Sequence, residues 1–216
     1  MVTLGPTREQ WDGARFWSNP STGRMGGALA VAAWLRGAKV TAICGPGVDV
    51  VMPLDIEKVN VTSAREMFEA AQDTWPGVDI GIFTAAVADF APVPPDCGQN
   101  KFKKDSLGGA PLALNFRQNP DILATFGQNK APGKKILGFA AETTANMADL
   151  LPLARIKLER KGADMIAANR INGSSGAFGA DNAILAVVDA QGKEEIWQPM
   201  PKSDAAWELL TWLLQT

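Results

Sequence analysis

Short apolar blocks and longer helical segments alternate along the chain. The blocks are bounded by turn residues, which predicts buried strands at residues 2–4, 39–44, 79–83, 135–140 and 164–168. Helices are predicted between them, at residues 25–36, 64–75 and 144–161. Gly37 predicts the end of the first helix, and Ser63 with Glu66 predicts a capping box at the start of the second. This alternation predicts a parallel sheet with right-handed crossovers.

Two regions depart from the alternation. Residues 183–188 and 194–198 flank the turn sequence DAQGK, which predicts an antiparallel hairpin before a final helix capped by Ser203. Residues 92–110 are rich in proline, glycine and charge, and we expect them to form a long surface flap. The fold expected is therefore α/β and Rossmann-like. It is a doubly wound, mostly parallel sheet with helices on both faces and a C-terminal antiparallel hairpin.

Length and composition narrow the function classes. The 216 residues suit one domain spanning 1–216, and a net charge of -2 gives no basic field for nucleic acid. Two cysteines without a CxxC spacing, and no apolar N-terminal leader, predict a protein of the reducing cytoplasm. No apolar run is long enough to predict a membrane span. The sequence has no histidine and no tyrosine, so it lacks the commonest general base.

Glycines around the first predicted helix raise the possibility of a dinucleotide site. Gly23, Gly26 and Gly27 precede an Ala/Leu-rich helix, whose N-terminus could bind phosphate, although they could equally allow close helix packing. A short-chain dehydrogenase would place its glycines directly after the first strand and an acid after the second. Here Gly5 and Gly23 are far apart, the second strand ends in CGP, and the usual tyrosine is missing.

Other candidate residues lie in the predicted flap and at strand ends. The KFKK sequence at 101–104 could neutralise a polyphosphate or be a solvated turn. Asp89 follows the third predicted strand, where it could hold a hydrated cation or be a solvated carboxylate. Asp121 is a candidate helix cap. Lys157 and Lys161 are spaced to share one helix face, which is either ligand-binding or solvated.

The order of these segments resembles one family. The sequence carries, in order, GPTRE at 5–9, SNPSTGRMG at 18–26, AAVADF at 85–90, KFKK at 101–104, NPDIL at 119–123, GFAAET at 138–143, AAN at 167–169 and FGADNA at 178–183. Together they closely resemble the phosphopantothenate–cysteine ligases of coenzyme A biosynthesis, over nearly the whole chain. Arg24 departs from the lysine common in that family, and Pro20 and Thr22 replace other small polar residues.

The resemblance implies a two-step ligation in a homodimer. The family joins 4′-phosphopantothenate to cysteine through an acyl-cytidylate, with CTP as co-substrate and Mg²⁺ or another divalent cation. Bacterial members commonly carry a flavin-dependent decarboxylase domain before the ligase, whereas this chain starts at the first predicted strand. An NAD(P)-dependent oxidoreductase and a non-catalytic nucleotide-binding module remain the alternatives.

The resemblance also assigns residues to roles. Lys101 would support cytidylate formation, and Asn19 would promote conversion of the acyl-cytidylate. Phosphate would bind at Ser21, Thr22 and Gly23, and Asp89 is the candidate metal ligand. The nucleotide contacts would be Phe83, Thr84, Ala85, Asp89, Lys101, Pro120, Asp121, Ile122, Leu123, Phe139, Lys157 and Lys161.

Overall fold

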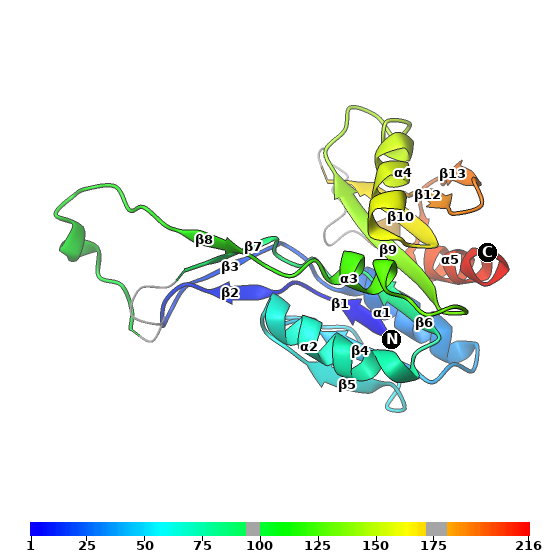
Figure 1. Ribbon diagram of the computed structural model, residues 1–216, viewed down its shortest axis with the longest axis horizontal. Coiled ribbons are helices and arrows are strands. Elements are labelled where there is room, and N and C mark those ends of the chain that lie inside the picture. Colours follow the sequence, from blue (N-terminus) through cyan, green and yellow to red (C-terminus); the bar gives the residue numbers. More distant parts are fainter. Residues whose placement is uncertain (94–99, 172–180) are drawn as a thin grey trace.

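An eight-stranded sheet forms the centre of the body in a computed structural model that describes residues 1–93, 100–171 and 181–216 (Figure 1). The order across the sheet is β13-β12-β10-β9-β6-β1-β4-β5. These strands are β1 (Val2–Leu4), β4 (Thr41–Cys44), β5 (Glu57–Asn60), β6 (Ile80–Phe83), β9 (Lys135–Glu142), β10 (Met165–Arg170), β12 (Ala186–Asp189) and β13 (Glu194–Ile196). The six neighbouring strands β10, β9, β6, β1, β4 and β5 run parallel to one another. Strands β12 and β13 are antiparallel additions at one edge.

Helices cover both faces of this sheet (Figure 1). The helices are α1 (Arg24–Leu35), α2 (Ala64–Thr74), α3 (Ile122–Gln128), α4 (Leu150–Lys161) and α5 (Lys202–Gln215). One apolar core joins α1 and α5 to one face, and a second joins α2, α3 and α4 to the other. Neighbouring strand residues alternate between the two cores, as Ala42 and Ile43 do, because successive side chains of a strand point to opposite faces. The expected doubly wound α/β fold with its C-terminal hairpin is confirmed.

The path of the chain reverses at the middle of the sheet. It begins at β1, proceeds outward to β4 and β5, and then returns to β6 on the other side of β1. The gap between the carboxyl ends of β1 and β6 is thus a topological switch point, the place where open α/β sheets bind ligands.

Several predicted boundaries need correction. The fourth helix begins at Leu150 and not at residue 144, since residues 144–149 form turns in which the Asn146 and Asp149 side chains bond main-chain amides. Ser203 does not cap α5, because its hydroxyl bonds the Asp204 carboxylate and Pro201 holds the cap position. The second helix keeps its predicted capping box, in which the Glu66 amide donates to the Ser63 hydroxyl.

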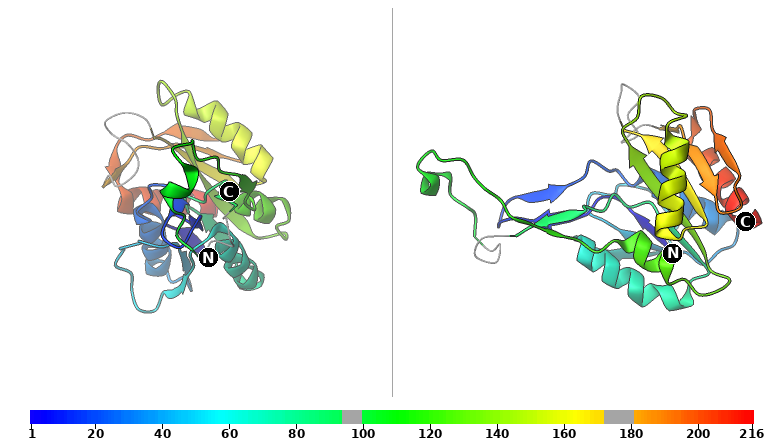
Figure 2. Two further views of the ribbon diagram at one scale, coloured as in Figure 1. Left: turned by 90° about the vertical axis from the view of Figure 1, so that its left-hand side faces the viewer. Right: turned by 45° about the horizontal axis from the view of Figure 1, so that its top comes forward.

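Two strand pairs build an arm that extends away from the body (Figures 1 and 2). They are β2 (Arg8–Gln10) with β3 (Phe16–Ser18), and β7 (Phe90–Pro92) with β8 (Phe116–Gln118). A short 3-10 turn, η3 (Lys104–Leu107), lies between β7 and β8. The sequence predicted neither pair, because each strand has only three residues and the large apolar side chains of these strands are exposed. Of the predicted flap at 92–110, residues 94–99 lie outside the described residues.

The remaining short elements connect the larger ones. They are η1 (Trp75–Gly77) and the strand pair β11 (Asn182–Ala183) with β14 (Met200–Pro201). In the ranges that the structure describes, no helix has both the length and the apolarity needed to cross a membrane.

Candidate functional site

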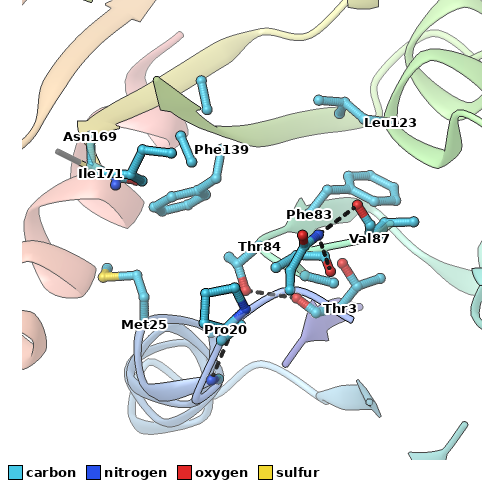
Figure 3. Close-up of a pocket in the computed structure, with 18 of the residues that line it drawn as sticks. Thr3, Pro20, Met25, Phe83, Thr84, Val87, Leu123, Phe139, Asn169 and Ile171 are labelled. Atoms are coloured by element: carbon cyan, nitrogen blue, oxygen red, sulfur yellow. Dashed lines mark hydrogen bonds between the residues drawn. The ribbon is translucent and has the colours of Figure 1, made fainter. Parts of the chain in front are cut away.

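A large cleft opens at the carboxyl ends of β1, β6 and β9, at the switch point of the sheet. Its volume is about 1240 Å³. Pro20 and Met25 lie on one wall, Phe139 and Leu123 lie on the other, and Phe83 and Thr84 lie between them (Figure 3). Every predicted site residue lines this cleft except Lys101. Segments that are far apart in the sequence therefore meet at one place.

The N-terminus of α1 forms part of the first wall. Gly23 holds the cap position with a φ of 73°, and no side chain caps the helix. The next residues, Arg24, Met25 and Gly26, all line the cleft. Uncapped amides at the start of a twelve-residue helix, with the positive end of its dipole, suit a phosphate group.

Gly26 also has a packing role. A Cβ at Gly26 would lie 2.3 Å from Oγ1 of Thr84 and 2.4 Å from Cβ of Leu4. The helix therefore approaches β1 and the end of β6 closely only because residue 26 has no side chain. The Thr84 hydroxyl donates to the Thr3 carbonyl at 2.7 Å, which fixes the strand end beside it. Both interpretations of these glycines, close packing and phosphate binding, are thus compatible with the geometry.

Asn19 lies just before this helix and is tied to the loop after β6. Its Nδ2 donates to the Ala86 and Val87 carbonyls, each at 3.2 Å. Its own carbonyl accepts from the Ser21 amide at 2.9 Å. These bonds hold the side chain at the floor of the cleft between two segments that both line it.

The opposite wall carries two lysines of α4, each beside a carboxylate. The Lys157 ammonium lies 2.9 Å from Oε1 of Glu142, and Lys161 is bonded to Asp121. Asp121 also caps α3 by accepting from the Ala124 amide at 3.0 Å. Partial burial by itself raises the pKa of Asp121, but the bonds from Lys161 and the Ala124 amide outweigh it and leave the pKa below its ordinary value. The two lysines share one helix face, as their spacing predicted.

Asp89 lies at the rim of the cleft where the arm begins. Its backbone carbonyl accepts from the Asn119 amide at 2.9 Å, and its side chain is exposed. Among the described residues, no group of three or more His, Cys, Asp or Glu could bind a metal ion. A single carboxylate at the rim of the cleft is nevertheless compatible with Mg²⁺, which proteins bind through one or two carboxylates together with substrate phosphates.

A cationic pair at the α1 end of the cleft was not predicted. Lys202, the first residue of α5, lines the cleft together with Arg24, and Nη1 of Arg24 lies 2.8 Å from Oδ1 of Asp181. Partial burial is the main cause that lowers the pKa of Lys202, and the charge of Arg24 lowers it further. No local pattern near Lys202 indicates that its helix starts at the cleft, because the sheet topology alone brings it there.

Lys101 lies apart from this cleft. The Asn100 carbonyl accepts from the Gly13 amide at 3.4 Å, and the Phe102 amide donates to the Asp12 carboxylate at 2.9 Å. Both contacts are at the turn between β2 and β3, on the arm. The structure therefore brings together the predicted residues of the body but leaves Lys101 on the arm.

Known proteins resemble this chain in sequence and in fold. The family model described as "DNA/pantothenate metabolism flavoprotein C-terminal domain" matches residues 1–216. The chain belongs to this family. The predicted resemblance to the phosphopantothenate–cysteine ligases of coenzyme A biosynthesis is confirmed, because coenzyme A biosynthesis proteins are among its relatives.

Three relatives of the flavoprotein C-terminal domain illustrate the range of similarity. The coenzyme A biosynthesis bifunctional protein CoaBC of Bacillus subtilis is 39% identical over 211 residues, which are 97% of this chain and 49% of that protein. A cysteine/cysteine sulfinic acid decarboxylase from an unknown prokaryotic organism is 35% identical over 99% of this chain and 57% of its own length. A crystal structure of the C-terminal domain of CoaBC is 33% identical, with a TM-score of 0.77, over 99% of this chain and 92% of that one. The chain thus spans about half the length of the curated relatives it matches.

Proposed function

We propose that this flavoprotein C-terminal domain ligates 4′-phosphopantothenate to L-cysteine at the cleft described above. One observation carries the proposal. A single cleft at the switch point gathers six of the separated segments whose order resembles the ligase family. Its walls offer an uncapped helix N-terminus, two lysines and a carboxylate, which together suit a nucleoside triphosphate. A bifunctional CoaBC protein is among its relatives, and a solved C-terminal domain of CoaBC matches nearly the whole chain.

The reaction has two steps. A carboxylate oxygen of 4′-phosphopantothenate attacks the α-phosphorus of the nucleotide, and the bond to the bridging oxygen breaks to release pyrophosphate. The amine of cysteine then attacks the acyl carbon, loses a proton and displaces the nucleoside monophosphate. Lysine side chains would neutralise the charge of the triphosphate, and most of the acceleration would come from positioning the reactants.

Asn19 is proposed to act in the second step. An amide side chain can bind an acyl oxygen and a phosphate oxygen without adding a competing charge. In the structure Nδ2 donates to the Ala86 and Val87 carbonyls, between the α1 side of the cleft and the end of β6, so the amide would exchange these partners for substrate oxygens when it acts. Asn19→Asp would set a carboxylate against those two carbonyls. We expect acyl-nucleotide to accumulate in this variant, and normal amide formation would refute the role.

The co-substrate is proposed to be CTP with Mg²⁺ or another divalent cation. The cation would be held by Asp89 and by phosphate oxygens, and it would supply charge neutralisation at the α-phosphate. Competition between CTP and ATP at equal concentration tests the choice of base. Release of CMP in preference to AMP is the expected outcome.

The oxidoreductase alternative finds less support in the crevice beside the glycines. The loop after β4 places Val48 and Val50 there: a Cβ at Gly5 would lie 2.3 Å from Cγ2 of Val48, and one at Gly27 would lie 2.3 Å from Cγ1 of Val50. The two valines therefore pack against Gly5 and Gly27, so these glycines allow the loop after β4 to approach closely. β4 also ends at Cys44, with no acid at the position that binds the ribose in dehydrogenases.

We also propose that the domain acts as a cytoplasmic homodimer. The arm exposes aromatic side chains, including Trp17 (54% exposed) and Phe116 (41%), whose ring centroids lie 5.4 Å apart. Such a patch on a projecting arm is typical of a protein interface. Trp17→Ser should weaken self-association in sedimentation velocity, while Trp207→Ser, at an exposed tryptophan on the body, should not. A flavin-dependent decarboxylase domain, in the same chain or as a separate partner, fits the bifunctional relatives.

Pyrophosphate release tests the proposed function directly. The protein is incubated with 4′-phosphopantothenate, cysteine and each of several nucleotides, and pyrophosphate and the amide product are measured. Release with CTP, dependent on 4′-phosphopantothenate, is expected. No release with any nucleotide, together with NADP binding, would refute the ligation and favour the oxidoreductase. Binding of CTP without turnover would favour a non-catalytic module.

A further inference from the structure

The turn between β2 and β3 holds the backbone on both sides of Lys101. The Gly13 amide donates to the Asn100 carbonyl at 3.4 Å. The Phe102 amide donates to Oδ2 of Asp12 at 2.9 Å, and the Phe102 carbonyl accepts from Nη2 of Arg15 at 2.8 Å. These three bonds join segments that are about ninety residues apart in the sequence, and Lys101 lies between the two residues that they hold.

Asp12 is the centre of this contact, which we call the clasp (residues 11–15 with 100–102). Oδ1 of Asp12 accepts from the amides of Ala14 and Arg15, each at 2.8 Å, which forms the turn itself. Oδ2 accepts from Nε of Arg15 at 2.9 Å, from Nη2 of Arg15 and from the Phe102 amide. One oxygen thus shapes the turn while the other connects the turn to the Lys101 segment.

Burial and ring contacts strengthen the clasp. Asp12 is fully buried and Trp11 is 6% exposed, whereas Phe16, Trp17, Phe90 and Phe116 on the same arm are exposed. The Trp11 and Phe102 ring centroids lie 5.5 Å apart, and the Arg15 guanidinium lies 4.2 Å from the Trp11 ring centroid. The bonds from Arg15, followed by those from the amides, hold the pKa of Asp12 far below its usual range, so its carboxylate is charged at any working pH.

The Lys101 side chain contrasts with its anchored neighbours. It is exposed, and within the described parts of the chain no hydrogen bond or ion pair engages its ammonium. A lysine in a glycine- and proline-rich segment would ordinarily sample many backbone conformations, and each would aim the ammonium differently. Fixing the residues on both sides limits that sampling before any substrate binds.

We propose that Asp12 is a positioning residue for Lys101, acting through the clasp to fix the direction in which the lysine is presented to the nucleotide. This inference rests on the proposed function, since it is the ligation that gives Lys101 its role. Asp12 itself need not touch the substrate. The clasp would lower the cost of ordering the lysine in each catalytic cycle, and its loss would reduce the rate of the first step while leaving the fold of the body intact.

The test combines hydrogen exchange with a double-mutant cycle. Asp12→Asn preserves the shape but removes the charge that attracts Arg15 and the Phe102 amide. We expect exchange at the Phe102 amide to accelerate at least about tenfold, and pyrophosphate release to slow about tenfold to a hundredfold. In a Lys101→Gln background the same substitution should slow release no further, because the lysine that it positions is already absent.

Asp189→Asn is the matched control. Asp189 is also buried and also shapes a hairpin turn, accepting from the Gln191 and Lys193 amides at 2.9 Å, but it belongs to the body. This variant should lower the melting temperature without changing Phe102 exchange. Phe102→Ala, which leaves the Asp12–Arg15 pair intact, gives a second variant of the clasp in case Asp12→Asn folds poorly. It should accelerate exchange at residues 100–103 by a smaller factor.

The outcomes separate the two proposals. If wild type releases no pyrophosphate, the ligation is wrong, yet the exchange measurement still reports whether the clasp holds the segment. If wild type is active and Asp12→Asn exchanges at the wild-type rate, the clasp is wrong. If exchange accelerates but release is unchanged, or if release falls equally in the Lys101→Gln background, Asp12 does not position Lys101.

Discussion

The cleft and the arm differ in how much buried core supports them. The cleft lies on the rigid sheet, and its residues are brought together by strand ends and helix starts that are buried below it. The arm has almost no core of its own: it consists of two strand pairs with exposed aromatic residues, held at its turn by the clasp. The cleft thus supplies binding groups from the body, whereas the arm holds the one predicted catalytic lysine away from it.

This difference suits the cleft to binding a ligand and the arm to presenting a group that moves. Groups on strand ends and helix N-termini are held in place because moving them would disrupt the buried core. They can therefore bind a charged ligand without rearranging. A group on the arm can move at smaller cost, since outside the clasp few buried contacts hold the arm. The proposed two-step reaction would benefit from both, because the nucleotide would stay bound in the cleft while the neutralising charge could leave after the first step.

The largest effect should come from the arm. Lys101→Gln removes the ammonium that is proposed to neutralise the triphosphate, and we expect pyrophosphate release to fall about a hundredfold or more. Nucleotide affinity, measured by calorimetry, should change far less, because the cleft is untouched. Lys103→Gln removes a charge two residues away and should retain most of the activity. Equal losses in the two variants would mean that the arm contributes general positive charge and not a specific group.

The sequence predicted the cleft better than the arm for a physical reason. Residues such as Thr84, Asp121 and Phe139 follow apolar runs or begin helices, and the ends of parallel strands must meet at one edge of a sheet. β2, β3, β7 and β8 have three residues each, and their large apolar side chains are exposed, so they are too short and too irregular for a periodicity to predict them. Lys202 and Asp12 were missed because only the folded topology brings Lys202 beside Arg24 and Asp12 beside Phe102.

A second prediction tests whether the body holds the wall of the cleft rigidly. Gly26→Ala would place a Cβ 2.3 Å from Oγ1 of Thr84, and we expect the free energy of unfolding to fall by about 1–3 kcal/mol. Nucleotide binding should weaken as well, since α1 must move away from β1. Gly77→Ala, at a glycine with open space around it, should change stability much less in the same denaturant titration. An unchanged stability in Gly26→Ala would show that α1 can shift freely, contrary to a rigid cleft.

A third prediction separates a lysine of the cleft from a matched lysine outside it. Lys157 pairs with Glu142, and Lys130 pairs with Asp164 at a similar exposure, but only Lys157 lines the cleft. Lys157→Met should raise the KM for the nucleotide about tenfold, which corresponds to about 1.4 kcal/mol, with little change in kcat. Lys130→Met should leave KM unchanged and lower stability only. A loss confined to kcat in Lys157→Met would instead assign this lysine to the chemical step.

The smallest effect concerns Asp121, at the start of α3. Asp121→Asn keeps a good N-cap for the Ala124 amide but loses the charge that pairs with Lys161, so stability at neutral pH should fall by only about 0.5 kcal/mol. Because folding lowers the pKa of Asp121, the carboxylate stabilises the fold above the pKa of the unfolded chain, near 4. That contribution is lost as the pH falls through the lowered pKa of the folded state.

The pH dependence therefore distinguishes the ion pair from the cap. Wild type and Asp121→Asn should differ in stability at pH 7 and converge once the pH falls well below 4, when Asp121 is protonated in both states of the wild type. Asp149→Asn, at the start of α4 and without a lysine partner among the described residues, should show no such convergence. If the difference in stability between wild type and Asp121→Asn persisted at low pH, the capping bond and not the charge would stabilise this wall of the cleft. Lys161 could then bind a nucleotide phosphate without the loss of an ion pair that stabilises the fold.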